Sequence, residues 1–222
     1  MKRVVVTGLG MINALGLDKD ISFKNICDGK TGVKKITLFD ATDFPVQIAA
    51  QIDDFDPATV MEAKEIKKAD RFIHLGLKAA NDAMIDANFE EFDPNEFGVS
   101  SAAGIGGLPN IEKNSNICLE KGPKKISPFF IPSALVNMLG GLVSIAHNLK
   151  GPNLSSVTAC AASTHAICEA AKSIMIGETK AMLVIGAESA ICPVGIGGFA
   201  AMKALSTRND DPAAASRPFD AN

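Results

Sequence analysis

Short runs of β-branched and aliphatic residues alternate along the chain with longer segments of helical period. Four of these runs, residues 3–7, 97–102, 153–158 and 181–187, are typical of buried strands. Strands that alternate with helical segments predict an α/β fold, with a mostly parallel sheet covered by helices.

Two segments predict helices. Residues 64–88 place apolar side chains at spacings of three and four, which predicts one amphipathic helix. Residues 163–176 are small or apolar on nearly every face, so we expect this helix to be buried on all sides. The Gly- and Pro-containing stretch 193–198 and the polar tail 206–222 predict loops.

The composition is that of a globular protein with a slight excess of acid. The 222 residues include 22 Lys and Arg against 25 Asp and Glu, so the formal net charge is −3. This charge argues against a basic nucleic-acid binder. Hydrophobic residues make up 47%, which predicts a packed core, and Trp and Tyr are absent. We therefore expect ligand recognition by aliphatic side chains.

Cysteine usage and the N-terminus bear on the compartment. The five cysteines are irregularly spaced and give no metal-ligand pattern, so we expect no metal site. The N-terminus runs directly into a strand-like segment without a signal-peptide pattern, which favours the cytoplasm and reduced thiols. The longest apolar stretch, residues 131–149, is interrupted by Pro132, Asn137 and His147, so we expect no membrane span.

Two glycine-containing segments follow predicted strands. Gly8 and Gly10 lack the third glycine of a dinucleotide fingerprint, because Asn13 stands in its place, and a tight turn explains them. The run from Gly104 to Gly107 indicates backbone that passes close to another group.

Cys160 is the most informative position. It lies between the predicted strand 153–158 and the predicted helix 163–176, at a sharp turn. Backbone N–H groups at a helix N-terminus stabilise negative charge on a thiol sulfur or on an oxyanion. The flanking alanines leave room for a substrate carbonyl. Position alone is compatible with an acyl-accepting nucleophile and equally with a buried structural thiol.

None of the three histidines forms a persuasive pair with Cys160. His165 follows it by five helical residues, about 140° around the helix, so we favour a structural or supporting role. His74 has polar neighbours and is expected in solvent.

The lysines form two clusters, near residues 64–71 and near residues 121–125. These clusters are either a solvated face or a docking patch for an acidic partner.

Several stretches resemble the β-ketoacyl-acyl carrier protein synthases, type II most closely. The resemblance is carried by VVVTGLGMINALG, AAGIGGLPNIE, KKISPFFIPSALVNMLGG, SSVTACAASTHAI and GIGGFAAMKALSTRNDDPAAASRPFD, which together extend over essentially the whole chain. The resemblance implies a thiolase-like fold of two similar α/β halves in a homodimer. Residues 1–222 would then be the N-terminal half plus the start of the crossover, with the C-terminal half absent.

The resemblance also implies roles for particular residues. Cys160 would be the acylated nucleophile and its own backbone N–H one oxyanion donor. Ile105 and Phe199 would line and gate the acyl pocket, and Phe130 would reach the neighbouring subunit's pocket. Basic positions that match the docking surface for acyl carrier protein are Lys64, Lys67, Lys68, Lys124, Lys125 and Lys203.

The implied reaction is a decarboxylating Claisen condensation in fatty-acid elongation. An acyl group on Cys160 would be attacked by the carbanion that malonyl-acyl carrier protein forms on losing CO₂, without a metal or redox cofactor. The family's HGT and GH histidines, its lysine and its glycine-rich loop do not occur in this sequence. The 222 residues alone are therefore expected not to condense.

Three alternatives remain open. The enzyme alternatives are a type I synthase and a thiolase-like condensing enzyme that uses coenzyme A. An alternative of another class is a non-catalytic dimerisation or chain-length partner. The presence of Cys160 argues against that last alternative, because the silent partners of this family lack the nucleophile.

Overall fold

The computed structural model describes residues 2–89 and 91–220. The chain divides into two compact units. The first comprises Met1–Met11 and Asp56–Ser189, and the second comprises Ile12–Phe55 and Ala190–Asn222.

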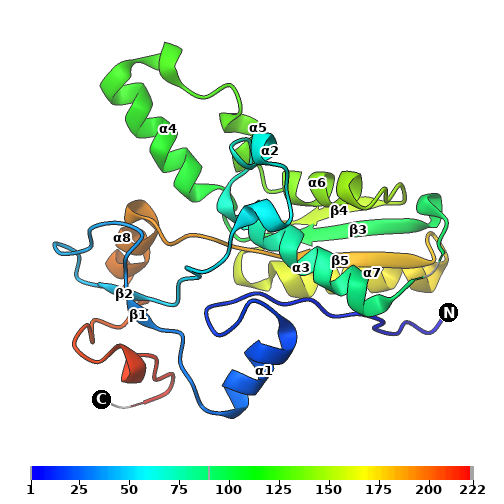
Figure 1. Ribbon diagram of the computed structural model, residues 1–222, viewed down its shortest axis with the longest axis horizontal. Helices are drawn as coiled ribbons and strands as arrows, with labels where there is room; N and C mark the ends of the chain where they lie inside the picture. The colour runs from blue at the N-terminus through cyan, green and yellow to red at the C-terminus, as the bar shows by residue number, and fades with distance from the viewer. Residues whose placement is uncertain (1, 90, 221–222) are drawn as a thin grey trace. The chain divides into compact units, whose positions relative to one another are not determined.

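The first unit is built around a three-stranded parallel sheet (Figure 1). Its strands β3 (Phe97–Ala102), β4 (Asn153–Ser156) and β5 (Ala181–Gly186) lie in the order β4-β3-β5. Ala102 at the end of β3 lies opposite Ser156 and Gly186. The sequence predicted all three strands, and the end of the one assigned to 153–158 lies two residues earlier.

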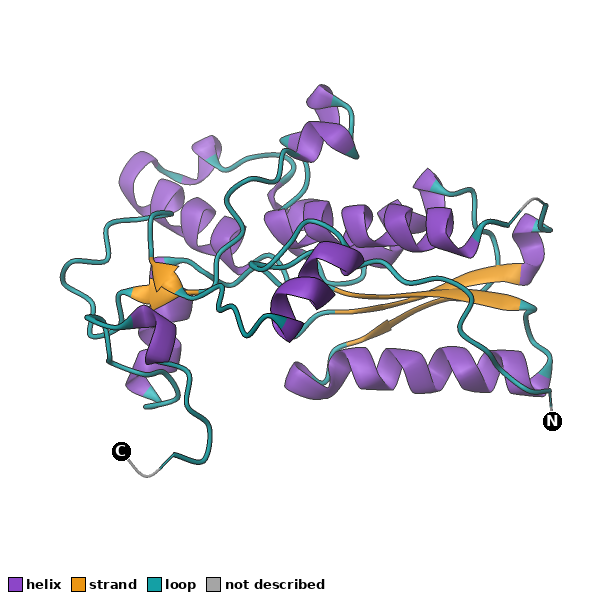
Figure 2. Ribbon diagram, turned by 60° about the horizontal axis from the view of Figure 1, so that its bottom comes forward, coloured by secondary structure: helices purple, strands orange, loops and turns teal. Residues whose placement is uncertain are grey.

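Helices cover both faces of this sheet (Figure 2). Helix α7 (Ala162–Ile176) packs on one face, and α3 (Arg71–Ala87) and α6 (Met138–Ala146) pack on the other. All six residues of β3 are buried, as expected for the central strand of a covered parallel sheet. The predicted α/β fold is confirmed.

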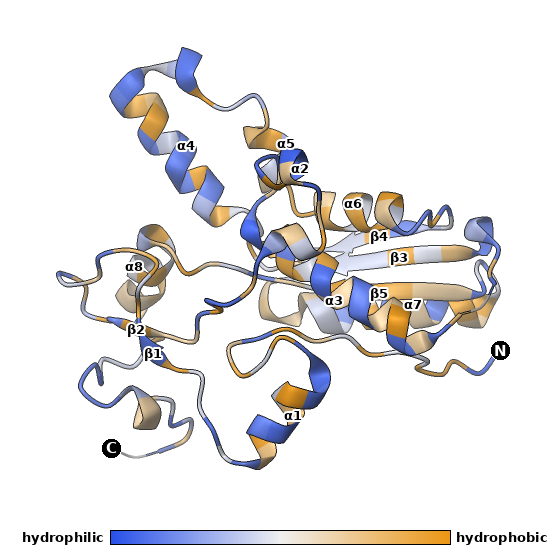
Figure 3. Cartoon of the chain, in the orientation of Figure 1, coloured by the Kyte–Doolittle hydropathy of each residue, from blue (hydrophilic) through white to orange (hydrophobic). Residues whose placement is uncertain are grey.

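Three further helices complete the first unit: α2 (Ala63–Ile66), α4 (Leu108–Lys121) and α5 (Phe130–Ala134). Short 3-10 helices occur at Pro57–Thr59, Pro94–Glu96, Pro123–Lys125 and Ala159–Ala161. Polar residues dominate much of α4, whereas β5 is largely hydrophobic (Figure 3). None of the described helices combines the length and apolar character that crossing a membrane requires.

The prediction of one helix over residues 64–88 is wrong. The segment forms two helices, α2 and α3, which are separated at Asp70. Asp70 has extended backbone angles, and its carboxylate accepts a hydrogen bond from the N–H of Phe72 in the first turn of α3. The side chain that ends the helical run is therefore the N-cap of the second helix.

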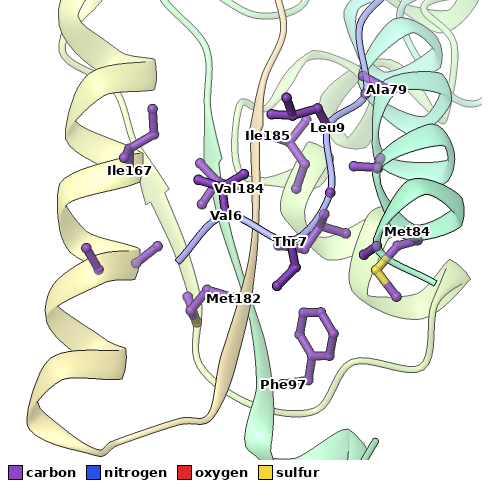
Figure 4. A pocket seen from close by; sticks show the side chains of 18 of the residues that line it. Val6, Thr7, Leu9, Ala79, Met84, Phe97, Ile167, Met182, Val184 and Ile185 are labelled. Carbon is purple, nitrogen blue, oxygen red and sulfur yellow. The ribbon is translucent and has the colours of Figure 1, made fainter. Parts of the chain in front are cut away.

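The prediction of a buried strand at residues 3–7 is also wrong. Val5 and Val6 are 62% and 79% exposed, and the segment is not paired with β5. An apolar cavity of about 380 Å³ lies between this segment, β5, α3 and α7 (Figure 4). The segment is fastened to α3 instead, where the N–H of Leu9 donates to the carboxylate of Asp86 at 2.9 Å.

Close approach to α3, rather than a tight turn, explains the glycines of this segment. Neither Gly8 nor Gly10 has a positive φ. A Cβ on Gly10 would lie 1.9 Å from the carbonyl oxygen of Ala79 in α3. Glycine is the residue that permits such a contact between two backbones.

The prediction that the helix over residues 163–176 is buried on all sides is wrong for this chain. In α7 the buried residues are Ala162, Ala166, Ala170 and Ser173, which form one stripe. Ile167 and Ile176 are 57% and 76% exposed. The sheet covers only the side of the helix that carries the small residues, so the larger apolar side chains face outward.

The second unit contains α1 (Lys19–Cys27), α8 (Pro193–Ala201) and an antiparallel pair, β1 (Lys34–Lys35) and β2 (Ile48–Ala49). The prediction of a loop at 193–198 is wrong, because proline is compatible with the first turn of a helix, where Pro193 lies. The tail from residue 206 is mostly loop, with one 3-10 helix at Pro212–Ala214, and its last two residues lie outside the described part. The core is formed by Ile36, Ala41, Val46, Ile48, Ile196 and Ala215.

Candidate active site

Three loops meet at one edge of the parallel sheet. Since the strands run in the same direction, the segments that follow β3, β4 and β5 all leave from their carboxyl ends. Carboxyl ends of parallel strands are the usual position of ligand sites in α/β folds. Cys160, Ile105 and Glu188 lie in these three loops.

Cys160 lies where the chain turns from β4 into α7. The turn is a 3-10 helix, Ala159–Ala161, and α7 begins at the next residue. Ala159 has a φ of 50°, an uncommon conformation for a residue with a Cβ. The thiol is exposed. An exposed thiol in this position is suited to nucleophilic attack, and the N-terminal N–H groups of the 15-residue helix beside it are suited to stabilising an oxyanion.

His165 contacts the turn but not as a partner of the thiol. Its Nδ1 lies 2.7 Å from the hydroxyl oxygen of Thr158, two residues before Cys160. The hydrogen bond joins the segment before Cys160 to the first turns of α7. This arrangement agrees with the supporting role that helical spacing predicted.

Glu188, which sequence reasoning missed, binds the loop after β3. Its carboxylate accepts hydrogen bonds from the backbone N–H groups of Gly104 at 2.9 Å, Ile105 at 2.7 Å and Gly106 at 3.2 Å. Successive backbone N–H groups that converge in this way form a binding site for an anion. The expectation that the backbone of residues 104–107 passes close to another group is confirmed, and the group is a carboxylate.

The loop that Glu188 binds lies against the turn that carries Cys160, Ala159–Ala161. A Cβ on Gly104 would lie 3.7 Å from the carbonyl carbon of Ala159, which precedes Cys160. The side chain of Ile105 is 39% exposed at this edge of the sheet. The structure therefore brings Cys160 and the predicted pocket residue Ile105 to the same edge.

The other two predicted pocket residues lie elsewhere in the chain. Phe130 is the first residue of α5 and is half-buried. Phe199 lies on α8 in the second unit and is 39% exposed. Their part in an acyl pocket remains a prediction.

The lysines of the first unit differ in their exposure to solvent and in their ion pairs. Lys64 pairs with Glu62 at 2.8 Å, and Lys68 pairs with Glu65 at 2.7 Å. The Lys68 ammonium also lies 5.3 Å from the centre of the Phe129 ring. The side chains of Lys67, Lys124 and Lys125 are exposed. Lys203 is exposed too, but it belongs to the second unit.

The remaining histidines are His74 in α3 and His147 directly after α6. His74 is buried, contrary to the expectation of solvation, and its Nε2 lies 3.1 Å from the carbonyl oxygen of Ile66. Burial lowers the pKa of His74 and that of His147. Over the described ranges, no three His, Cys, Asp or Glu side chains are grouped so as to hold a metal ion.

Comparison with known proteins places the chain in a family. The sequence model described as "Beta-ketoacyl synthase, N-terminal domain" matches residues 1–222. The chain belongs to the beta-ketoacyl synthase family. The solved structure of a beta-ketoacyl synthase from Burkholderia phymatum superposes with a TM-score of 0.88 at 28% identity, over 100% of this chain and 55% of that one. The thiolase-like ketosynthase fold is confirmed.

A bacterial relative agrees with the type II resemblance. A 3-oxoacyl-[acyl-carrier-protein] synthase 2 of Coxiella burnetii is 50% identical over 221 residues, which are 99% of this chain and 53% of that protein. The chloroplastic synthase I of Arabidopsis thaliana is 39% identical over 99% of this chain and 47% of its own length. The chain therefore spans about half the length of these relatives.

A further structure shows the same fold with a partner. The ketosynthase AntDE, solved with its acyl carrier protein AntF and a bound hexaketide, superposes with a TM-score of 0.79 at 22% identity. The superposition covers 93% of this chain and 56% of that one.

Proposed function

We propose that this chain is the nucleophile-bearing half of a β-ketoacyl-acyl carrier protein synthase that elongates fatty acids. The observation that carries the proposal is Cys160, an exposed thiol at a strand-to-helix turn on the carboxyl edge of the sheet. The 50% identity to a 3-oxoacyl-[acyl-carrier-protein] synthase 2 supports the choice of substrates.

The reaction has two steps at Cys160. First, its sulfur attacks the carbonyl carbon of an acyl-carrier-protein thioester, and the carrier thiol leaves with a proton. Then malonyl-carrier protein loses CO₂, and the electron pair released attacks the acyl-Cys160 carbonyl. The carbon–sulfur bond breaks, which yields β-ketoacyl-carrier protein and the Cys160 thiolate, and the thiolate takes up a proton from solvent to regenerate the thiol. The N-terminal end of α7 stabilises the oxyanion at both attacks.

The decarboxylating step is assigned to the other half of the protein. The exposed apolar side of α7, which carries Ile167 and Ile176, supports a covering half of similar architecture. The outer edge of β4 supports assembly as a homodimer, because Leu154 is 37% exposed and Val157, just beyond the strand, is 55% exposed. The free thiols of Cys27, Cys118, Cys160 and Cys168 are consistent with a reducing, cytoplasmic setting.

The test is a condensation assay with the full-length protein. Acyl-carrier protein and malonyl-carrier protein should yield β-ketoacyl-carrier protein and CO₂ without added metal or redox cofactor. Loading of Cys160 should be faster from carrier-protein thioesters than from coenzyme A thioesters of the same acyl chain. Preferential loading from coenzyme A, or no loading at all, would contradict the proposal.

Charge reversal on the first unit should weaken carrier-protein binding. The exposed side chains of Lys67, Lys124 and Lys125 are the ones to test, since Lys68 also contacts Glu65 and Phe129. We expect Lys67→Glu, and the double variant Lys124→Glu with Lys125→Glu, to raise the Kd by about tenfold and to flatten its salt dependence.

The control for this experiment is Lys150→Glu. Lys150 is also exposed, but it precedes β4 and so lies at the opposite edge of the sheet from Cys160. Calorimetric titration with acyl carrier protein at low and high salt measures both effects. If the wild type and all variants bind acyl carrier protein with equal affinity at low salt, these lysines form a solvated face and not a docking surface.

A further inference from the structure

The loop between β3 and α4 is held by one carboxylate from the loop that follows β5. Glu188 leaves the carboxyl end of β5, and residues 104–106 leave the carboxyl end of β3, its neighbour in the sheet. Three consecutive N–H groups of the loop point at its oxygens, and the N–H of Ser189 lies 3.2 Å from Oε1. Four backbone donors therefore converge on one exposed side chain.

The loop cannot be expected to keep this shape on its own. N–H groups that point in one direction repel one another unless a negative charge lies between them. Hydrogen bonds to an ionised acceptor are stronger than those between neutral groups. The carboxylate of Glu188 thus supplies the counter-charge that stabilises the loop.

Two parts of the proposed site depend on the position of this loop. Ile105 contributes one of the three N–H groups, so the bond that holds its backbone also fixes where its exposed side chain begins. Gly104 contributes another, and it lies close to Ala159 of the nucleophile turn.

We propose that Glu188 is a positioning residue that fixes Ile105 and the nucleophile turn by binding the backbone of residues 104–106. The carboxylate acts through that loop and takes no part in the chemistry. The consequence for acyl-chain selection rests on the proposed function, in which Ile105 lines the acyl pocket.

The experiment compares Glu188→Ala and Glu188→Gln with the wild type in the full-length protein. Amide hydrogen exchange at residues 104–106 should accelerate by at least about tenfold in Glu188→Ala and by less in Glu188→Gln, which keeps one acceptor oxygen. The ratio of kcat/KM for long and short acyl chains should shift by about fivefold or more in Glu188→Ala.

Two controls separate positioning from general damage. Glu169→Gln removes a carboxylate on α7 that pairs with Lys172 at the surface, and it should leave both measurements unchanged. Formate added to Glu188→Ala should restore slow exchange and wild-type selectivity, whereas chloride at equal ionic strength should not. A residue that merely supports the fold would show no such rescue.

The outcomes separate this proposal from the proposed function. Unchanged exchange at residues 104–106 in Glu188→Ala would overturn the binding role of Glu188. Faster exchange with unchanged selectivity and unchanged acylation of Cys160 would overturn its positioning role. A wild-type protein that forms no acyl-Cys160 would overturn the proposed function, and exchange with formate rescue would still decide whether Glu188 holds the loop.

Discussion

Replacing Cys160 by serine should lower the condensation rate of the full-length protein by at least about a thousandfold. A serine hydroxyl is a weak nucleophile without a paired base, and His165, the histidine nearest in sequence, is bound to Thr158 instead. Serine preserves the size of the side chain, so the loss would reflect chemistry rather than packing. The assay measures release of CO₂ and formation of β-ketoacyl-carrier protein.

Cys168 provides the matched control. It is also exposed, but it lies within α7, eight residues beyond Cys160 and away from the carboxyl edge of the sheet. Cys168→Ser should retain full activity. Peptide mapping after brief exposure to acyl-carrier protein should place the acyl group on Cys160 alone. An acyl group on Cys168, or unchanged condensation by Cys160→Ser, would exclude Cys160 as the nucleophile.

Replacing Asp70 by alanine should destabilise the protein by about 3 kcal/mol. Asp70 is 3% exposed and caps two helices, since its oxygens accept from the N–H of Phe72 in α3 and from that of Asn110 in α4. Alanine would leave the buried N–H of Phe72 and the half-buried N–H of Asn110 without this acceptor. Urea unfolding followed by circular dichroism measures the change.

The matched control for Asp70 is the exposed cap Asp56. Its carboxylate accepts from the N–H of Ala58 in a single short 3-10 helix. Asp56→Ala should cost about 0.5–1 kcal/mol. Equal unfolding midpoints for Asp70→Ala and Asp56→Ala would show that the double cap contributes no more than an ordinary one.

Asp70 also makes the stability of the protein depend on pH. Burial raises the pKa of Asp70, and the nearby charge of Glu188 adds to the rise. The stabilisation from the neutral carboxyl is complete below the unfolded pKa of about 3.9, and it is lost as pH rises through the higher folded pKa. The stability of the wild type relative to Asp70→Asn should therefore fall with pH over this window and stay level above it.

Where local pattern determines structure, the sequence was sufficient. Strands β3 and β5 are short aliphatic or small-residue runs bounded by polar segments, and both begin at the predicted residues. The position of Cys160 at a turn into a helix followed from the order of strand and helix alone, and the structure has this arrangement.

Where contacts between residues far apart in the chain determine the structure, the sequence was not sufficient to predict it. The break at Asp70 depends on a cap shared with α4, which lies about 40 residues further along. The valines at residues 4–6 suit a strand, but glycine contacts with α3 hold that segment away from β5. Glu188 was missed because its partners are backbone groups, which carry no signature in sequence. Its position directly after a predicted strand was the available signal.

The hydrogen bond from the N–H of Gly104 to Glu188 joins residues 84 positions apart in the chain, so it is expected to form late in folding. Contacts of such long range form slowly, because a large loop must close first. On the ribosome, Glu188 is added 28 residues after Cys160, a delay of about 1–6 s at ordinary elongation rates. The loop beside Cys160 is therefore held in place only after Glu188 has been synthesised, and the site becomes complete only once β5 has joined the sheet.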